Sequence, residues 1–232
     1  MITRILLVSI LTAFVSHAGE PVKLDFSTAE QWKLSFQQAN ALAAEPDQPG
    51  VGGLAGRVRV VEEIEELRFR GSPFSWGVPG ERLLVEFKFK LEKGTDGVAS
   101  VGIMVPGRLM NNSGGTMVMR YVCNAKVGGL LESTVDGRRQ KFTVPVVIEP
   151  ERVYLLRARF AIELGDSVRS SLELHDCGPS GTDAPRLVAE LPSSDVPSSE
   201  LAGAPKVEVG IRVGGANIPW IDDFLIESGG AR

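Results

Sequence analysis

The strongest constraint on the fold of this chain is a strict alternation of apolar and polar residues between positions 82 and 92. Leu83, Val85, Phe87, Phe89 and Leu91 alternate with Leu84, Glu86, Lys88, Lys90 and Glu92. Successive side chains of a β-strand point to opposite faces, so this pattern predicts a strand with one buried face and one face in water.

A second pair of alternating runs surrounds the dipeptide Gly165-Asp166. The polar positions of the two runs are Arg157, Arg159 and Glu163 in residues 154–164, and Arg169, Ser171, Glu173 and His175 in residues 168–175. A two-residue connection that contains glycine, placed between alternating runs, is typical of a β-hairpin. We therefore expect residues 154–164 and 168–175 to pair as antiparallel strands.

Shorter apolar runs predict further strands along most of the chain. These are Val22–Phe26, Lys33–Phe36, Arg57–Val61, Glu66–Arg70, Ala99–Val105, Thr116–Cys123, Leu130–Thr134, Gln140–Val144, Lys206–Val213 and Trp220–Ser228. About a dozen short strands without a long helix favour an all-β fold. The expected architecture is an antiparallel two-sheet β-sandwich.

Three stretches are expected to be loops: Gln37–Gly50, Gly107–Gly115 and Gly178–Pro205. The last is rich in Ser, Pro and Gly, and its length makes it a candidate functional loop. Within it, Arg186–Leu191 fits a short edge strand and Asp195–Leu201 a helical turn.

The first 18 residues have the order of a secretory signal peptide. Arg4 precedes an apolar run over residues 5–15, and Ser16-His17-Ala18 supplies small residues for cleavage. The apolar run is shorter than the roughly 20 residues that span a bilayer. We expect cleavage after Ala18 and one domain over residues 19–232, in a protein that is secreted, periplasmic or at the cell surface.

The composition restricts the class of binding partner, but it does not decide whether the two cysteines form a disulfide. Loss of Arg4 with the signal changes the net charge from −4 to −5, and mild acidity argues against nucleic acid, which needs clustered Lys and Arg. No membrane span is expected after the signal. Cys123 and Cys177 are the two cysteines. In an exported chain they form either a disulfide or two separate thiols.

Features along most of residues 19–232 resemble the concanavalin A-like lectin/glucanase superfamily in its laminin-G-like form. They are Leu24-Asp25-Phe26 followed by Trp32, Val51-Gly52-Gly53-Leu54, the strand Leu83–Leu91 and the closing Trp220–Ile226. The resemblance implies a jelly roll of two curved sheets, with the first and last strands side by side. That superfamily includes sugar-binding modules, glycoside hydrolases, lyases and adhesion domains, so it leaves the function open.

The catalytic patterns of the enzymes in that superfamily are absent from the sequence. Its glucan hydrolases use a Glu-x-Asp-x-x-Glu strand, which holds an acid and a nucleophile on one face. Its lyases use a Gln-x-His strand and a Tyr-rich strand. The acidic residues Glu62, Glu63, Glu65 and Glu66 have neither spacing, and we interpret them as a solvated turn or edge. No catalytic residue is assigned.

The sequence also favours no metal site and no cofactor. His175, Asp176 and Cys177 are consecutive, so alternation prevents all three from facing one ion. His175 is expected at the surface. In the last strand, Asp222 shares the parity of Phe224 and is expected to face the apolar side. There its carboxylate needs backbone N–H groups in a turn or, less simply, calcium. Asp223 is expected to face outward, in solvent or paired with a basic side chain.

Two aromatic loops are the candidate ligand site. Phe74 and Trp76 lie among turn residues, and Trp220 follows Asn217 closely. Sugar C–H faces stack on aromatic rings while hydroxyl groups need planar polar partners, so Phe74, Trp76, Trp220 and Asn217 are predicted to form a platform. The alternative is that the tryptophans pack between the sheets.

The sequence therefore favours an exported, non-catalytic β-sandwich. Its expected role is to bind an extracellular polysaccharide or other glycan, or to act as an adhesion or scaffold module. The alternative is a carbohydrate-active enzyme, either a glycoside hydrolase or similar to a polysaccharide lyase, whose active site carries none of the patterns sought above.

Overall fold

The computed structural model describes residues 21–24, 36–37, 42–45, 57–60, 64–69, 80–91, 99–106, 116–124, 128–135, 140–163, 167–197, 210–214 and 220–230. These residues form two antiparallel sheets, and no helix occurs among them. The fold class predicted from the alternation is confirmed. The proposed signal peptide lies outside these ranges.

One sheet has eight strands and contains the long alternating runs. Its hydrogen-bonded order is β13 (Arg186–Pro197), β12 (Ser167–Asp176), β11 (Val153–Glu163), β6 (Glu81–Lys90), β15 (Trp220–Gly230), β4 (Arg57–Val60) and β3 (Leu42–Glu45), with β1 (Val22–Leu24) also paired to β15. The predicted hairpin is present, since β11 and β12 pair from Tyr154 with Asp176 to Glu163 with Ser167. The first and last strands are neighbours, as the resemblance implied.

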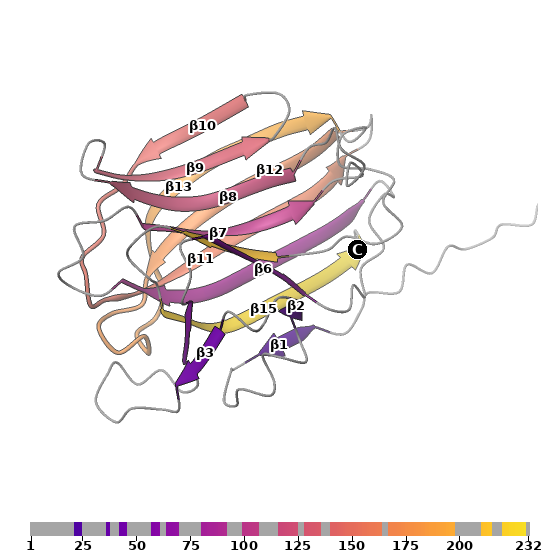
Figure 1. Ribbon diagram of the computed structural model, residues 1–232. Helices are drawn as coiled ribbons and strands as arrows, with labels where there is room; N and C mark the ends of the chain where they lie inside the picture. The colour runs from indigo at the N-terminus through magenta and orange to yellow at the C-terminus, as the bar shows by residue number, and fades with distance from the viewer. Residues whose placement is uncertain are drawn as a thin grey trace, which may run out of the picture.

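The other sheet has seven strands. Its order is β10 (Gln140–Pro145), β9 (Gly128–Val135), β8 (Thr116–Asn124), β7 (Ala99–Pro106), β14 (Gly210–Gly214), β5 (Ile64–Phe69) and β2 (Phe36–Gln37). Figure 1 shows the two sheets as stacked layers, with β8 and β7 in one and β12, β11 and β6 in the other. Residues from both layers form one hydrophobic core.

Aromatic rings connect the two layers of the core. Phe89 of β6 stacks on Tyr121 of β8 with ring centroids 6.1 Å apart, and its centroid lies 6.0 Å from that of Tyr154. Phe89 is 0% exposed. Such rings bury large apolar areas and add geometry-dependent contacts, so this cluster holds β6 against the opposite sheet.

We predict that Phe89→Ala lowers the free energy of unfolding by about 3–5 kcal/mol, because it removes the central ring and leaves a cavity. The measurement is urea unfolding. Phe142→Ala is the matched control, since Phe142 of β10 is 43% exposed, and its loss is expected to stay below about 1 kcal/mol. Equal losses in the two variants would contradict this assignment of the core.

Three segments depart from the sequence-based expectations. The expected loop Gln37–Gly50 contains β3. Within the expected loop Gly178–Pro205, the predicted edge strand Arg186–Leu191 is confirmed, but it continues to Pro197 as the twelve-residue strand β13. Asp195 therefore lies in a strand and not in a helical turn. The prolines of this segment suggested a loop, but β13 is an edge strand, where a missing N–H is tolerated. Glu65 belongs to β5 and not to a turn, while Glu66 lies in the same strand, where a strand was predicted to begin.

A β-bulge in β15 reverses the expected orientation of Asp222. The register with β6 shifts between Asp222 and Leu225, and Asp223 has a left-handed φ of 49°. Asp222 pairs with Lys88, on the side of β6 away from the core, while Ile221 and Phe224 both belong to the core. The expectation that Asp222 shares the face of Phe224 is wrong, because the bulge adds a residue between them.

The bulge is held by local polar contacts. The backbone N–H of Asp223 donates to Oδ1 of Asp222 at 2.8 Å, and Nζ of Lys88 lies 2.7 Å from Oδ2 of Asp223. The outward orientation and basic partner expected for Asp223 are confirmed.

The structure has Cys123 and Cys177 as free thiols. Cys177 is buried and packs with Val153 and Leu155 in a small cluster apart from the main core. Cys123 belongs to the other sheet and packs partly against the main core. Of the two alternatives that the sequence left open, the structure therefore has the separate thiols.

Asp176, at the end of β12, connects three parts of the chain. Its carboxylate accepts hydrogen bonds from Arg152 at 2.7 Å, the N–H of Gly178 at 2.8 Å and Arg186 at 3.2 Å. The Arg152 hydrogen bond is the main cause that holds the pKa of Asp176 below its ordinary value, against the opposing effect of burial. This carboxylate fixes the turn between β12 and β13.

The Asp176 contacts predict a pH-dependent stability. Because the folded pKa is lowered, the stabilisation is present above the unfolded value of about 4 and is lost as pH falls through the folded value. Asp176→Asn is expected to lower the free energy of unfolding by roughly 2 kcal/mol at pH 7 and to flatten the acid limb of its pH profile. Urea unfolding at several pH values measures both, and Glu190→Gln, at an exposed position of β13, is the control expected to change neither.

Candidate functional site

The outer face of the eight-stranded sheet carries the polar half of the alternation. The core-facing residues of β6 and β11 are buried, whereas Arg82, Leu84, Arg157 and Arg159 are partly or fully exposed. The alternation that drives folding therefore also presents a row of basic side chains to solvent.

An ion-pair network covers the middle of this face. Nε of Arg157 donates to Oε2 of Glu86 at 2.5 Å, and Nη1 of Arg157 lies 3.8 Å from Oε2 of Glu173. Arg159 also donates to Glu173. Glu173 therefore receives two arginines, and both carboxylates of the network are neutralised by cations.

His175 lies at the edge of this network and is not the surface histidine expected from the sequence. His175 is only 9% exposed. Nε2 lies 2.8 Å from Oε2 of Glu173, and the buried Nδ1 has no hydrogen-bond partner among the described residues. Burial, with the nearby charges of Arg157 and Arg159, lowers the pKa of His175.

We predict a pKa for His175 below that of a free histidine, and a rise in that pKa in Arg157→Gln. Removal of a neighbouring cation favours the protonated ring. NMR titration of the imidazole protons measures the shift, with the resonance assigned by its loss in His175→Gln. Arg186→Gln, which removes a cation that pairs with Asp176, is the control. An unchanged or lower pKa in Arg157→Gln would contradict the stated electrostatics.

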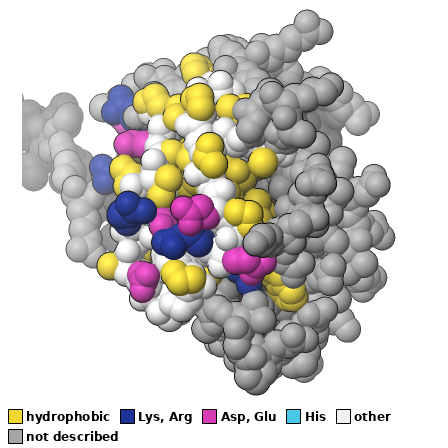
Figure 2. Space-filling view, turned by 90° about the vertical axis from the view of Figure 1, so that its left-hand side faces the viewer, with side chains coloured by type: hydrophobic (Ala, Val, Ile, Leu, Met, Phe, Trp, Pro, Cys, Tyr) yellow, Lys and Arg dark blue, Asp and Glu magenta, His cyan; other side chains and the backbone are white. Residues whose placement is uncertain are grey.

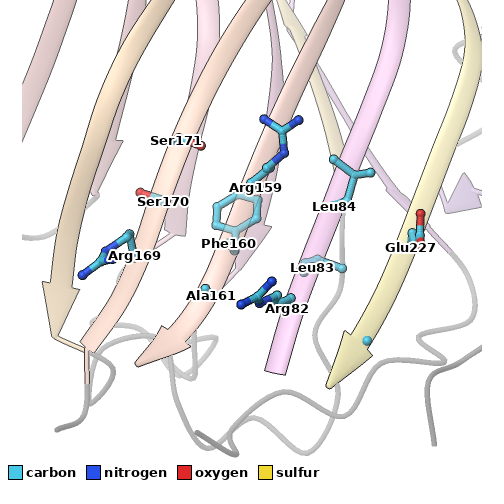
Figure 3. A pocket seen from close by; sticks show the side chains of 11 residues that line it. Arg82, Leu83, Leu84, Arg159, Phe160, Ala161, Arg169, Ser170, Ser171 and Glu227 are labelled. Carbon is cyan, nitrogen blue, oxygen red and sulfur yellow. The ribbon is translucent and has the colours of Figure 1, made fainter. Parts of the chain in front are cut away.

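A groove of about 470 Å³ opens beside the network, at the ends of β6, β11, β12 and β15. Its size is within the range of small-ligand pockets. Figure 3 shows Ala161 between Arg169 and Arg82, with Arg159 further along β11 and Glu227 on β15. Three arginines and one glutamate are the charged residues among the described residues that line it.

Strand register arranges the groove in rows across the sheet. One row consists of Arg169, Ala161, Arg82 and Gly229, and the next of Ser171, Arg159, Leu84 and Glu227. Leu84 and Ala161 supply an apolar floor, while the arginines, Ser171 and Glu227 supply donors and acceptors. Such a surface can hold a ligand that has both C–H faces and polar groups.

The described part of the groove lacks the elements of hydrolysis. Glycoside hydrolysis uses two carboxyl groups, one of them protonated, but Glu227 is the one carboxylate among the described lining residues. Glu86 and Glu173, nearby on the same face, are paired with arginines. No group of three or more metal-ligating side chains occurs within the described residues.

The seven-stranded sheet also has an ion pair on its outer face, but the two side chains are bonded to each other and the carboxylate is buried. Arg120 donates twice to Oε1 of Glu132, at 2.8 Å and 2.5 Å, and Glu132 is almost fully buried. Gly102 lies beside Arg120, and a Cβ there would come within 2.4 Å of the Cβ of Arg120. The close approach explains the glycine, and we assign this pair to structure.

A third face mixes charges of both signs. In Figure 2, acidic and basic side chains lie together beside hydrophobic ones, and the described part of this face has no uniform basic stripe. No helix in the described residues is long and apolar enough to cross a membrane.

The predicted aromatic platform falls largely outside the described residues. Phe74, Trp76 and Asn217 are not described, so the platform stays a prediction. Trp220 is described, pairs in register with Lys90 of β6, and is 7% exposed. Little of its ring is therefore open to a sugar in this structure.

The placement of Arg82 and Arg169 on either side of one residue was not predicted from the sequence. Alternation placed each on a polar face, but only the register of β6, β11 and β12 brings them to either side of Ala161. The signal available in the sequence was that both residues lie at the ends of strongly alternating strands.

Comparisons with known proteins show the fold. No protein-family model matches the chain, and no curated protein matches it. Lectin II from Ulex europaeus is similar over 92% of this chain and 100% of its own, with a TM-score of 0.59 and 12% identity. A variant of alginate lyase Aly36B in complex with alginate trisaccharide is similar over 95% of this chain and 96% of its own, with a TM-score of 0.50 and 10% identity. The chain has the concanavalin A-like jelly-roll fold.

Proposed function

We propose that this chain is an exported, non-catalytic sandwich that binds an extracellular glycan in the groove of its eight-stranded sheet. The observation that carries the proposal is the groove itself, where an apolar floor at Leu84 and Ala161 is surrounded by Arg82, Arg159 and Arg169. Export is supported by the signal-like residues 1–18.

The mixture of apolar and polar groups fits a sugar better than a purely apolar ligand. A pyranose ring has an aliphatic face that packs on methyl groups, and its hydroxyls require paired donors and acceptors. Arginine supplies several planar donors, while Ser171 and Glu227 supply acceptors. The similar structures include a lectin and a lyase in complex with an alginate trisaccharide, which supports a glycan as the class of ligand.

The test is binding of the purified protein to a panel of neutral and acidic polysaccharides, measured by affinity electrophoresis and calorimetry. We expect binding of at least one polysaccharide, and a loss of about tenfold or more in Gly229→Leu. A Cβ at Gly229 meets no atom within 4 Å, so the leucine enters the groove without disturbing the sheet. Ala184→Leu, in the exposed turn before β13, adds a leucine elsewhere and is expected to bind normally.

The same panel separates the groove from the aromatic platform. Trp76→Ala should weaken binding if the platform holds the ligand, and Gly229→Leu if the groove does. Release of shorter oligosaccharides during incubation would show instead that the protein is a carbohydrate-active enzyme. Failure of the purified protein to bind any polysaccharide in the panel would overturn the proposal.

A further inference from the structure

Two arginines lie on either side of a small residue in the groove. Arg82 of β6 and Arg169 of β12 are both register partners of Ala161 on the intervening strand β11. Neighbouring strands are about 4.8 Å apart, so the two backbones are about 10 Å apart. In Figure 3 the Arg82 side chain extends toward Ala161, while that of Arg169 extends away from it. The arginine side chain is long, and a change of rotamer at Arg169 would bring both guanidinium groups over the alanine methyl group.

The charges around this row are unequally neutralised. Arg159 is committed to Glu173. Arg169 lies 3.5 Å from Glu163 with both side chains more than one third exposed, and Asp195 is its register neighbour on β13. Arg82 forms no ion pair with any described residue. Glu227, the one acidic residue among the described residues that line the groove, belongs to the next row, beside Leu84.

We infer that the groove selects glycans that carry carboxylate or sulfate groups, with the anionic group bound over Ala161 between Arg82 and Arg169. This inference rests on the proposed function and adds the class of ligand. Guanidinium groups bind carboxylate and sulfate oxygens through planar, charge-assisted hydrogen bonds. A neutral sugar would leave at least the Arg82 guanidinium without a matching charge.

The rest of the protein disfavours a nonspecific attraction to polyanions. The chain has a net charge of −4, so long-range electrostatics repel an acidic polymer as a whole. Selective binding of such a polymer must therefore come from a local cluster of cations, and the row that contains Arg82 and Arg169 is such a cluster beside an open groove.

Gly229 provides a sharp test, because it ends the same row next to Arg82 and has open space at its Cβ. Gly229→Glu and Gly229→Gln fill nearly equal volumes, but only the glutamate adds a negative charge beside Arg82. Both proteins are compared by calorimetry with dextran, carboxymethyl-dextran and dextran sulfate, polymers that share one backbone. Thermal unfolding verifies that the two variants are equally folded.

We expect the unsubstituted protein to bind at least one charged dextran more tightly than dextran, with affinity that falls as salt rises. Gly229→Glu should bind that polymer about tenfold more weakly than Gly229→Gln, while the two variants treat dextran alike. Arg82→Gln, at an exposed position without a described ion pair, should also weaken the charged polymer about tenfold. The preference between the two charged dextrans identifies carboxylate or sulfate.

Equal binding of dextran and its charged derivatives, or equal effects of Gly229→Glu and Gly229→Gln, would overturn the inference. The proposed function would survive that result, since binding in the polysaccharide panel and its loss in Gly229→Leu do not depend on ligand charge. Absence of binding to both charged dextrans would also overturn the inference, and the panel then decides the proposed function separately.

Discussion

Strand β6 divides its side chains between two environments, and both the core and the outer face of the sheet depend on that division. Its inward residues, with Phe87 and Phe89 at the centre, join the two sheets through the core. Its outward residues Arg82, Leu84 and Glu86 belong to the groove and the ion-pair network. Because strand side chains alternate strictly, neither set can move without the other. A shift of one residue along β6 would place charges in the core and also dismantle the groove.

Much of the fold could be predicted from the sequence because alternation is a local property. β6, β11, β12 and the hairpin between the last two follow from residues that are adjacent in the chain. The segments that failed have weak local signals. The first half of β13 was predicted as an edge strand, but its second half contains Pro192 and Pro197, which suggested that the strand ends at Leu191. β3 has four residues. The bulge at Asp223 puts a non-glycine residue in a left-handed conformation, which an alternating pattern cannot show.

The site depends on register between strands, and the sequence shows register poorly. Alternation predicts that Arg82, Arg159 and Arg169 each face outward, but not that the first and third flank Ala161. That arrangement requires β6 and β12 to pair with β11 at fixed offsets, which are set by the core residues on the opposite face. His175 illustrates the same limit. Its parity was predicted, whereas its burial was not, so a polar strand position does not guarantee exposure.

The groove and the ion-pair network next to it differ in how their arginines are paired with carboxylates. In the network, arginine and glutamate alternate between strands, so Arg157 contacts Glu86 on one side and Glu173 on the other. Each pair offsets the cost of partial burial. In the network, the arginine of β11 has a carboxylate on each side. In the row of Arg82, Ala161 and Arg169, β11 contributes only a methyl group and the strands on each side contribute arginines. Among the described residues Arg82 has no ion-pair partner, and Arg169 pairs with Glu163 at an exposed site, where such a pair contributes little. An anion bound over Ala161 would pair with a guanidinium that the described residues leave without a carboxylate, so this row has more to gain from an anionic ligand than the network has.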